Sequence, residues 1–306
     1  MRLSVQAPFH LEATVRVLQR RPGNLIDAWD GERYRRAVRI AGCPVLLQVQ
    51  NRGTIDVPDL RLSIPGSEAT AHARIEASKT ASAILGLEQD VTPCERCAEA
   101  ERALRGIAIA LRGMRAPRYP DLFETFVNVI PFQQLSVEAG MSVVAQLVRH
   151  FGEVITLSAG RFHVFPAAEV IADVRTLSLK QCGMSLRKAQ TLRSVARDIA
   201  SGALTAESIA RLASSEAIAR LTGLSGIGAW SAALVLLRGF RRLDVFPPGD
   251  AGAERSLMSL MRLRSPASLA RIVNRFGDCR GQLYFYAIAS RALELGLIRA
   301  APPLDA

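Results

Sequence analysis

The spacing of hydrophobic positions changes after about the first hundred residues of the chain. Up to that point, apolar residues gather in short β-rich runs between turn residues, a pattern typical of antiparallel strands. Strands are predicted over residues 3–5, 37–40, 45–50 and 55–64, with a turn at 51–53. A helix is predicted over residues 68–85, with Ala71, Ile75 and Leu85 on one face.

From about Pro117 onward the apolar spacing becomes helical. Asp121 is expected to cap a helix that runs to residue 130, and another helix is predicted over 134–151. A helix over 186–199 follows Ser185, and Thr205 and Ser215 precede two more. The chain is therefore predicted to be α+β, with a small N-terminal antiparallel sheet domain that carries helices (residues 1–112) and an all-α core that holds the cleft (residues 113–306).

A glycine-rich connection stands out between two of the predicted helices. Gly223, Gly226 and Gly228 fall within six residues, and an apolar helix over 230–237 follows. Such a hairpin leaves the first N–H groups of the next helix unpaired at the positive end of its dipole. This arrangement suits a phosphate, although an ordinary turn between helices explains the glycines equally well.

The charge of the chain favours a polyanionic partner. The 306 residues carry a net charge of +11, and all but three of the 39 basic residues are Arg. With 49% hydrophobic and 22% charged residues the chain is expected to fold, and the excess of positive charge is typical of nucleic-acid binders. We see no signal peptide and no run long enough to span a membrane, so a cytoplasmic location is expected.

The five cysteines do not form a disulfide framework by their spacing. Cys94 and Cys97 are the close pair, and the remaining cysteines and the four histidines are scattered. A zinc or redox site would need further ligands at short spacing, so both are disfavoured and reduced cysteines are expected.

Several motifs, taken together, resemble the helix-hairpin-helix DNA glycosylase superfamily. They are the hairpin at 224–230, the segment at 237–240 and the run at 244–250, and upstream the stretches at 86–90, 111–124 and 130–136. The resemblance covers residues 85–300 and is closest to the bacterial 3-methyladenine DNA glycosylase II type (AlkA-type). The first hundred residues resemble that family's sheet domain only in their pattern of short β-rich runs and in their position in the chain.

The resemblance implies how the chain would hold duplex DNA. The hairpin residues Ser225, Gly226, Ile227, Gly228 and Ala229 would contact a backbone phosphate, which positions the DNA without reading its sequence. The carbonyls of Thr222, Leu224 and Ile227 would hold a monovalent cation, Na⁺ or K⁺, and no other cofactor is expected. Gln134 would fill the gap that a flipped base leaves in the stack, although hydrogen bonding at a helix start explains it about as well.

Asp250 is the predicted catalytic residue. Breaking an N-glycosidic bond develops positive charge on the sugar, which a nearby carboxylate stabilises, and the same group can orient or deprotonate the attacking water. A helix follows Asp250, so a capping role is the alternative, and the two roles are compatible.

Position 230 separates the branches of the family. Members that also cut the strand carry a Lys there, which forms a Schiff base, whereas this chain has Trp230. An indole face suits a cationic alkylated base. The predicted base pocket is Trp230, Leu234, Tyr284 and Tyr286. Leu234 occupies a position where the relatives have an aromatic residue. The two tyrosines lie in a segment where the relatives have a Trp, which this chain lacks.

The resemblance therefore implies a monofunctional DNA glycosylase that removes alkylated purines such as 3-methyladenine and 7-methylguanine from duplex DNA in base excision repair. It would act as a monomer, in the cytoplasm of a bacterium and in association with the nucleoid. Two alternatives stay open, namely a non-catalytic protein that binds damaged DNA and a glycosylase for oxidised or deaminated bases.

Overall fold

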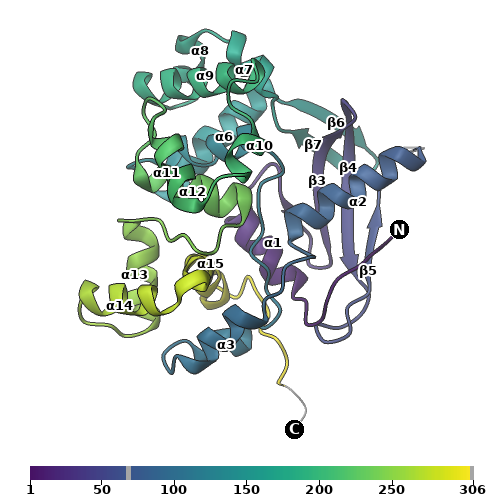
Figure 1. Cartoon of the computed structure of the whole chain (residues 1–306). Helices are drawn as coiled ribbons and strands as arrows, with labels where there is room; N and C mark the ends of the chain where they lie inside the picture. Colours follow the sequence, from purple (N-terminus) through teal and green to yellow (C-terminus); the bar gives the residue numbers. More distant parts are fainter. Residues whose placement is uncertain (67–69, 304–306) are drawn as a thin grey trace.

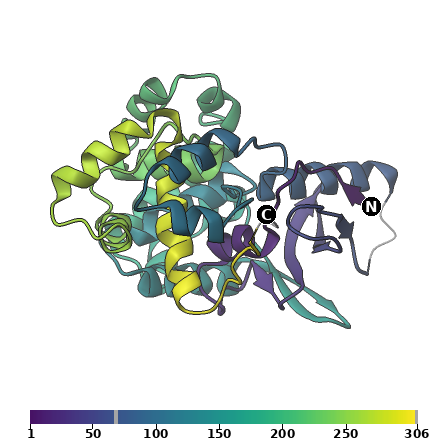
Figure 2. The same ribbon diagram turned by 90° about the horizontal axis from the view of Figure 1, so that it is seen from below.

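A sheet forms one side of the molecule, and most of the helices gather on the other side (Figures 1 and 2). The computed structural model describes residues 1–66 and 70–303. The strand order is β1-β5-β4-β3-β7-β6, and β2 pairs with β3 beside this path. The strands are β1 (Arg2–Leu3), β2 (Ala28–Trp29), β3 (Arg33–Ile40), β4 (Cys43–Asn51), β5 (Leu60–Ser63), β6 (Glu153–Leu157) and β7 (Gly160–Val164).

Pairing between the strands is antiparallel except for β3 and β7, which pair in parallel at Ala37 and Val164. The β3–β4 hairpin turns at Ala41 and Gly42, both with positive φ (50° and 79°), as a tight hairpin turn requires. Along β5, Leu60 and Leu62 are buried while their neighbours face out, so the sheet presents one apolar face.

The helices begin and end as follows. In the N-terminal half they are α1 (Leu11–Gln19), α2 (Ala71–Leu85), α3 (Thr92–Ala100), α4 (Arg105–Ala110), α5 (Leu122–Val127), the 3₁₀ turn η1 (Ile130–Phe132) and α6 (Val137–Phe151). In the C-terminal half they are α7 (Ala168–Asp173), α8 (Thr176–Gln181), α9 (Leu186–Ala200), α10 (Ala206–Ala210), α11 (Ser214–Thr222), α12 (Ala229–Phe240), α13 (Ala251–Leu260), α14 (Pro266–Arg275), η2 (Gly277–Cys279) and α15 (Arg280–Glu294).

The α+β fold class is confirmed, with a correction in the part expected to be all-α. Residues 153–164 form the β6–β7 hairpin, which extends the N-terminal sheet. The β-branched residues Val154, Ile155 and Thr156 before the turn were a signal for this hairpin. The division at residues 112 and 113 stays a prediction, and both this hairpin and the helices α3 and α4 pack across it.

Most predicted helix starts are confirmed by capping hydrogen bonds. Asp121, Ser185 and Thr205 each accept a backbone N–H three residues ahead. Several expectations are wrong. The helix after Asp121 ends at Val127, not at residue 130, and α11 begins at Ser214, so Ser215 lies inside it. Helix α6 begins at Val137, not at residue 134, because Ser136 is its cap. Helix α2 buries Ala77, Ala81, Ile84 and Leu85, whereas Ile75 is exposed, and the predicted start at residue 68 lies outside the described residues.

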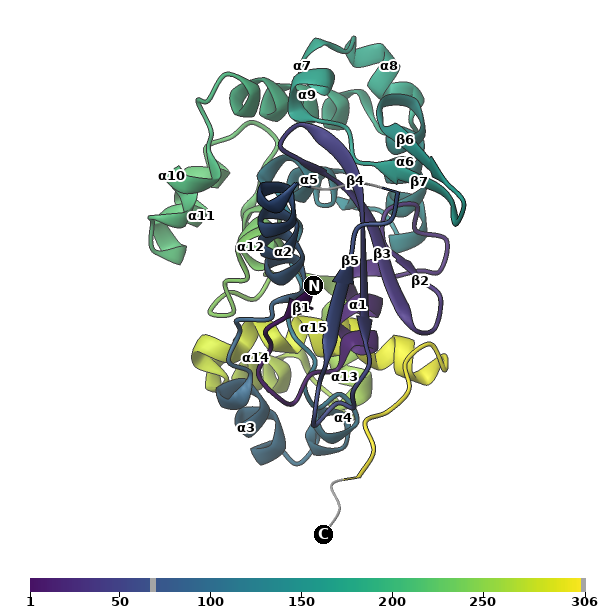
Figure 3. The ribbon, with the colours of Figure 1, turned by 90° about the vertical axis from the view of Figure 1, so that its right-hand side faces the viewer.

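Helix α1 was not predicted. It lies behind the sheet in Figure 3, and Figure 1 shows it between the sheet and α15. Leu11, Val15 and Leu18 pack in the core under the sheet, while Ala13 and Val17 pack in the larger helical core. Because α1 has an apolar face toward each core, it joins the sheet to the helices. Arg20 follows the C-terminal end of α1, and its side chain reaches Tyr284 of α15.

The cysteines correct another expectation. Cys94 of α3 and Cys279 of η2 form a disulfide across 185 residues of sequence, so the chain is not free of disulfides. Packing of α3 against η2 brings the two together, which no spacing in the sequence reveals. Cys97, the close neighbour of Cys94 in sequence, is a free thiol.

Two features are absent from the part of the chain that the structure describes. No helix within residues 1–66 and 70–303 is long and apolar enough to cross a membrane. In the same part of the chain, no three His, Cys, Asp or Glu side chains gather as a metal site would require.

Candidate active site

A cleft of about 1240 Å³ opens where α1, the η1–α6 turn, the α11–α12 hairpin, α13 and α15 meet. Most of the residues singled out in the sequence line it. They are Gln134, Thr222, Leu224, Ser225, Gly226, Ile227, Gly228, Trp230, Leu234, Asp250 and Tyr284. The fold thus brings together segments that are up to 277 residues apart in sequence, from Arg20 to Leu297.

Asp250 lies at the N-terminus of α13 and is half-buried. Its Oδ1 accepts the backbone N–H of Ala253 over 2.9 Å, and its Oδ2 accepts the indole N–H of Trp230 over 3.0 Å. These bonds fix the plane of the carboxylate, and each oxygen keeps a lone pair for another partner. Asp250 is therefore a helix cap and a cleft residue at the same time.

Trp230 lies in the first turn of α12 and is half-buried against the helical core. Its ring is held by the bond to Asp250, and Leu234, one turn further along α12, is buried and also lines the cleft. The aromatic ring and the carboxylate are therefore adjacent, although they come from different helices.

Tyr286 does not belong to the cleft, which corrects its expected place in the base pocket. Tyr284 lines the cleft, but residues two apart on a helix point to opposite sides. Tyr286 is packed in the core instead, and burial raises the pKa of its hydroxyl. Burial also raises the pKa of Tyr284, with Arg20 and Arg238 acting in the opposite direction.

Phe132 and Arg20 are two of the cleft residues that were missed in the sequence. Phe132, the last residue of η1, lines the cleft, and so does Arg20, whose guanidinium lies 5.0 Å from the centre of the Phe132 ring. The helical spacing of Leu11, Val15 and Leu18 was a signal for the helix that precedes Arg20. Nothing in the sequence indicated that its end would reach the cleft.

Gln134 lies at the tip of an exposed turn between η1 and α6, with φ of 55°. The turn is fixed from both sides. Gln133 donates from Nε2 to the carbonyl of Gly226 and to the hydroxyl of Ser231, both over 2.9 Å. Lys188 donates to the carbonyls of Pro131 and Gln133. Gln133 thus ties this turn to the hairpin, and the exposed Gln134 lines the cleft beside it.

The hairpin joins α11 to α12 and needs glycine at Gly226. Its φ is 81°, and a Cβ there would lie 2.1 Å from the Thr191 hydroxyl. Gly228 has ordinary φ and nothing within 4 Å of a built Cβ, and as the N-cap of α12 it offers no side-chain cap. The N–H groups at the start of α12 are therefore open toward the cleft rim, where an anion would be favoured.

Comparison with known proteins agrees with this geometry. The family described as HhH-GPD superfamily base excision DNA repair protein matches residues 127–276. A DNA-3-methyladenine glycosylase of Bacillus subtilis is 32% identical over 177 residues, 58% of this chain and 58% of that protein. The chain spans less than two thirds of the length of the curated relatives that it matches.

Solved structures share the fold. The 3-methyladenine DNA-glycosylase from Archaeoglobus fulgidus superimposes with a TM-score of 0.82 over 96% of this chain and 99% of that one, at 23% identity. An 8-oxoguanine glycosylase/lyase of Clostridium acetobutylicum, in complex with double-stranded DNA, gives 0.73 over 95% and 93%, at 18% identity. At these identities the likeness extends to the fold alone.

Proposed function

Because residues 127–276 form a domain of the HhH-GPD superfamily of base excision DNA repair proteins, we propose that this chain is a monofunctional DNA glycosylase. Its substrates would be alkylated purines of the 3-methyladenine and 7-methylguanine type in duplex DNA. The observation that carries the proposal is the Trp230–Asp250 pair, an indole and a carboxylate 3.0 Å apart in a cleft beside the glycine hairpin.

The hairpin and the Gln134 turn would hold the DNA on either side of the damaged base. Backbone N–H groups at the start of α12 would bind a phosphate, and Gln134 would occupy the space of the flipped nucleotide. Since Gln133 bonds to Gly226, the two contacts keep a constant separation. The net charge of +11 supplies the attraction for the phosphate backbone, and the protein would act as a monomer.

The hairpin carbonyls suit a monovalent cation. Among the described residues, no backbone N–H is recorded as bonded to the carbonyls of Thr222 or Ile227, and that of Leu224 accepts one from Ile227. Neutral carbonyl oxygens are the ligands that Na⁺ and K⁺ take. These three residues would hold the ion, which would add positive charge beside the phosphate. No other cofactor is proposed.

Asp250 would act on the sugar. As the N-glycosidic bond breaks, its carboxylate would stabilise the positive charge on the sugar and orient the attacking water. The Ala253 and Trp230 hydrogen bonds hold the carboxylate in place before the substrate arrives. A base made cationic by alkylation is a good leaving group and would stack on the indole.

Strand cleavage is not part of the proposal because position 230 offers no amine. Lys188 is the lysine that lines the cleft, and its ammonium group donates to the carbonyls of Pro131 and Gln133. Burial lowers the pKa of Lys188. Its hydrogen bonds nonetheless hold it at the base of the Gln134 turn.

The test is base release from methylated duplex DNA, scored for 3-methyladenine and 7-methylguanine. We expect release of both, with product strands that stay intact until heat or alkali is applied and no adduct after borohydride. Binding without release would favour a non-catalytic damage-binding protein. A borohydride-trapped adduct would contradict the monofunctional mechanism.

A further inference from the structure

Arg20 brings a guanidinium into the cleft from the N-terminal half of the chain. It follows α1 directly and lines the cleft together with Trp230 and Asp250. It also lines a second cavity of about 340 Å³. The proposed mechanism gives this half-buried cation no task.

Neighbouring side chains hold the guanidinium in place. Its Cζ lies 5.0 Å from the centre of the Phe132 ring, and Nη2 donates to the Tyr284 hydroxyl over 3.1 Å. The backbone at Arg20 has φ of 59°, a conformation that costs a non-glycine residue free energy. Since Phe132 and Tyr284 also line the cleft, Arg20 forms a continuous wall with them.

The hydrogen-bonding capacity of Arg20 is not used up. A guanidinium carries five N–H donors in a planar fork. Within residues 1–66 and 70–303, the bond recorded for this side chain goes to Tyr284, and Nε is buried without a partner. Since buried Nε cannot reach a ligand, the donors left for an acceptor on a bound base are those of the two Nη groups.

The charge of Arg20 affects which bases the cleft accepts. Burial acts to lower the pKa of Arg20, but the nearby Tyr284, Tyr119 and Asp250 outweigh it, and the pKa is raised. The group is therefore charged in the working protein. A base made cationic by alkylation is repelled by it, whereas a neutral base with a carbonyl oxygen gains a charge-assisted hydrogen bond.

We infer that Arg20 is a specificity-determining residue that favours neutral purines with a hydrogen-bond acceptor over purines made cationic by alkylation. The inference rests on the proposed function and deepens it. The Trp230 face serves the cationic base, and the Arg20 fork serves a neutral one such as deaminated adenine, with its carbonyl at C6. The cleft takes both classes, and Arg20 sets the ratio between them.

The test compares Arg20→Met with the wild type in single-turnover release from duplexes that carry 7-methylguanine or deoxyinosine. Release from the deoxyinosine duplex should fall about 10- to 100-fold, the effect of losing a hydrogen bond to a charged group. Release of 7-methylguanine should stay the same or become faster, because a repelling charge has gone. A role limited to packing α1 against α15 would lower both rates alike.

Two further variants separate charge, geometry and folding. Arg16→Met removes the same charge from α1 one turn earlier, where the side chain donates to Gln19 and does not line the cleft, and it should keep the wild-type ratio of the two rates. Arg20→Lys keeps the charge but loses the planar fork and its stacking. Its rate of deoxyinosine release should therefore lie between that of the wild type and that of Arg20→Met. Thermal unfolding of each variant shows whether it folds. If Arg20→Met does not fold, Arg20→Lys takes its place in the comparison with the wild type.

The outcomes distinguish this inference from the proposed function. If the wild type releases 7-methylguanine and not the deaminated base, the inference is overturned and the proposed function stands. Equal loss of both activities in Arg20→Met, or an equal shift of the ratio in Arg16→Met, also overturns it. Release of neither base by the wild type contradicts the proposed function itself.

Discussion

At the scale of single residues, Asp250 combines a structural and a chemical part. The Asp250→Asn variant keeps an oxygen that can accept the Ala253 N–H, so α13 should stay capped. We expect base release to fall by ~10² to 10³, the usual cost of one preorganised electrostatic contact. Binding to methylated duplex should survive or tighten, because a negative charge near phosphate has gone. Release at the wild-type rate would exclude Asp250 as the catalytic group.

Trp230 offers two separable properties, an aromatic face and an N–H donor to Asp250. Trp230→Ala removes both and should cost turnover of cationic bases roughly 1–2 kcal/mol, the scale of a desolvated cation–π contact. Trp230→Phe keeps a ring and removes the donor, so it should lose less. Rates on methylated duplex and affinities for plain duplex, measured side by side, test this. If Trp230→Ala loses affinity for plain duplex as well, Trp230 is a DNA-backbone contact instead.

At the scale of elements, the hairpin contains glycines with different physical roles. Gly226→Ala would put a Cβ against Thr191 at a positive φ, so we expect about 1–3 kcal/mol of lost stability. Gly228→Ala meets nothing in the free protein and should fold normally. It should weaken binding of plain and methylated duplex alike, because phosphate contacts carry no sequence information.

Thermal unfolding and DNA titration of both glycine variants check this division. A Gly228→Ala protein that loses affinity for methylated duplex alone would place the hairpin in lesion recognition and not in phosphate binding. A Gly226→Ala protein as stable as the wild type would mean that Thr191 moves aside at no cost.

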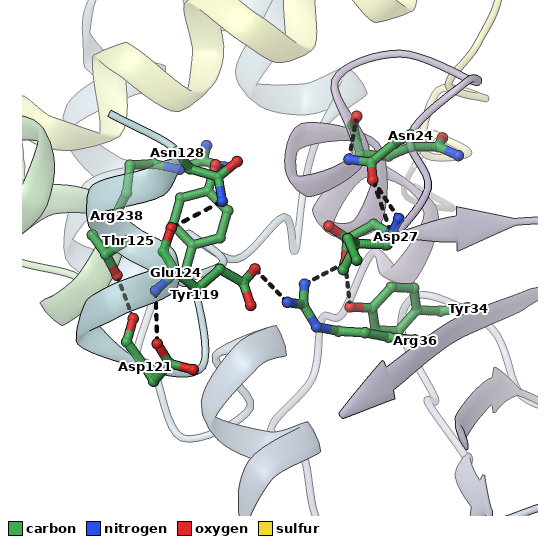
Figure 4. Close-up of polar contacts among 12 residues, drawn as sticks. Asn24, Asp27, Tyr34, Arg36, Tyr119, Asp121, Glu124, Thr125, Asn128 and Arg238 are labelled. Carbon is green, nitrogen blue, oxygen red and sulfur yellow. Dashed lines mark hydrogen bonds and ion pairs between the residues drawn. The ribbon is translucent and has the colours of Figure 1, made fainter. Parts of the chain in front are cut away.

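At the scale of the whole molecule, a buried ionic network joins the sheet to the helices (Figure 4). Arg36 of β3 is ion-paired with Asp27 over 2.7 Å and with Glu124 of α5, and Tyr34 donates to Asp27 over 2.7 Å. Two carboxylates thus share a single guanidinium. Burial, against the attraction of Arg36, raises the pKa of Glu124 to about 7.

The raised pKa of Glu124 predicts how stability depends on pH. The Glu124 carboxyl group binds its proton more tightly in the folded protein than in the unfolded chain. The folded protein therefore becomes less stable as the pH rises from the pKa of the group in the unfolded chain toward 7. The effect is at most on the order of 3 kcal/mol for a change of this size. Glu124→Gln should flatten this fall between pH 4.5 and 7. Urea unfolding across that range tests it, with Glu153→Gln at the surface as the control. An unchanged slope in Glu124→Gln would show that Glu124 is ionised throughout.

The net charge of the molecule gives a prediction of its own. With +11 on the chain, binding of plain duplex should weaken steeply and linearly in log–log form as salt rises, because counterions leave the DNA on binding. Titrations at several salt concentrations measure the slope. A flat dependence would contradict the phosphate contacts proposed for the hairpin.

Local features of the sequence determined much of this protein. Apolar spacing and capping residues act over a few positions, so the helices after Asp121, Ser185 and Thr205 could be predicted. The α+β class, the glycine hairpin and the position of Asp250 downstream of it could also be predicted from such local patterns. Motifs with defined order and spacing carried the resemblance, because phosphate binding and bond cleavage need particular residues at particular places in the chain.

Tertiary structure decided what depends on distant segments meeting. The sequence could not indicate that β6–β7 would join the N-terminal sheet or that Cys94 would meet Cys279. Helical spacing implies that Tyr284 and Tyr286 point to opposite sides, but only the tertiary structure decided which of them faces the cleft. The place of Arg20 follows from α1 packing against two cores at once, a property of neither core alone. Its charge lies beside Asp250 and Trp230 because three segments, far apart in sequence, close around one cleft.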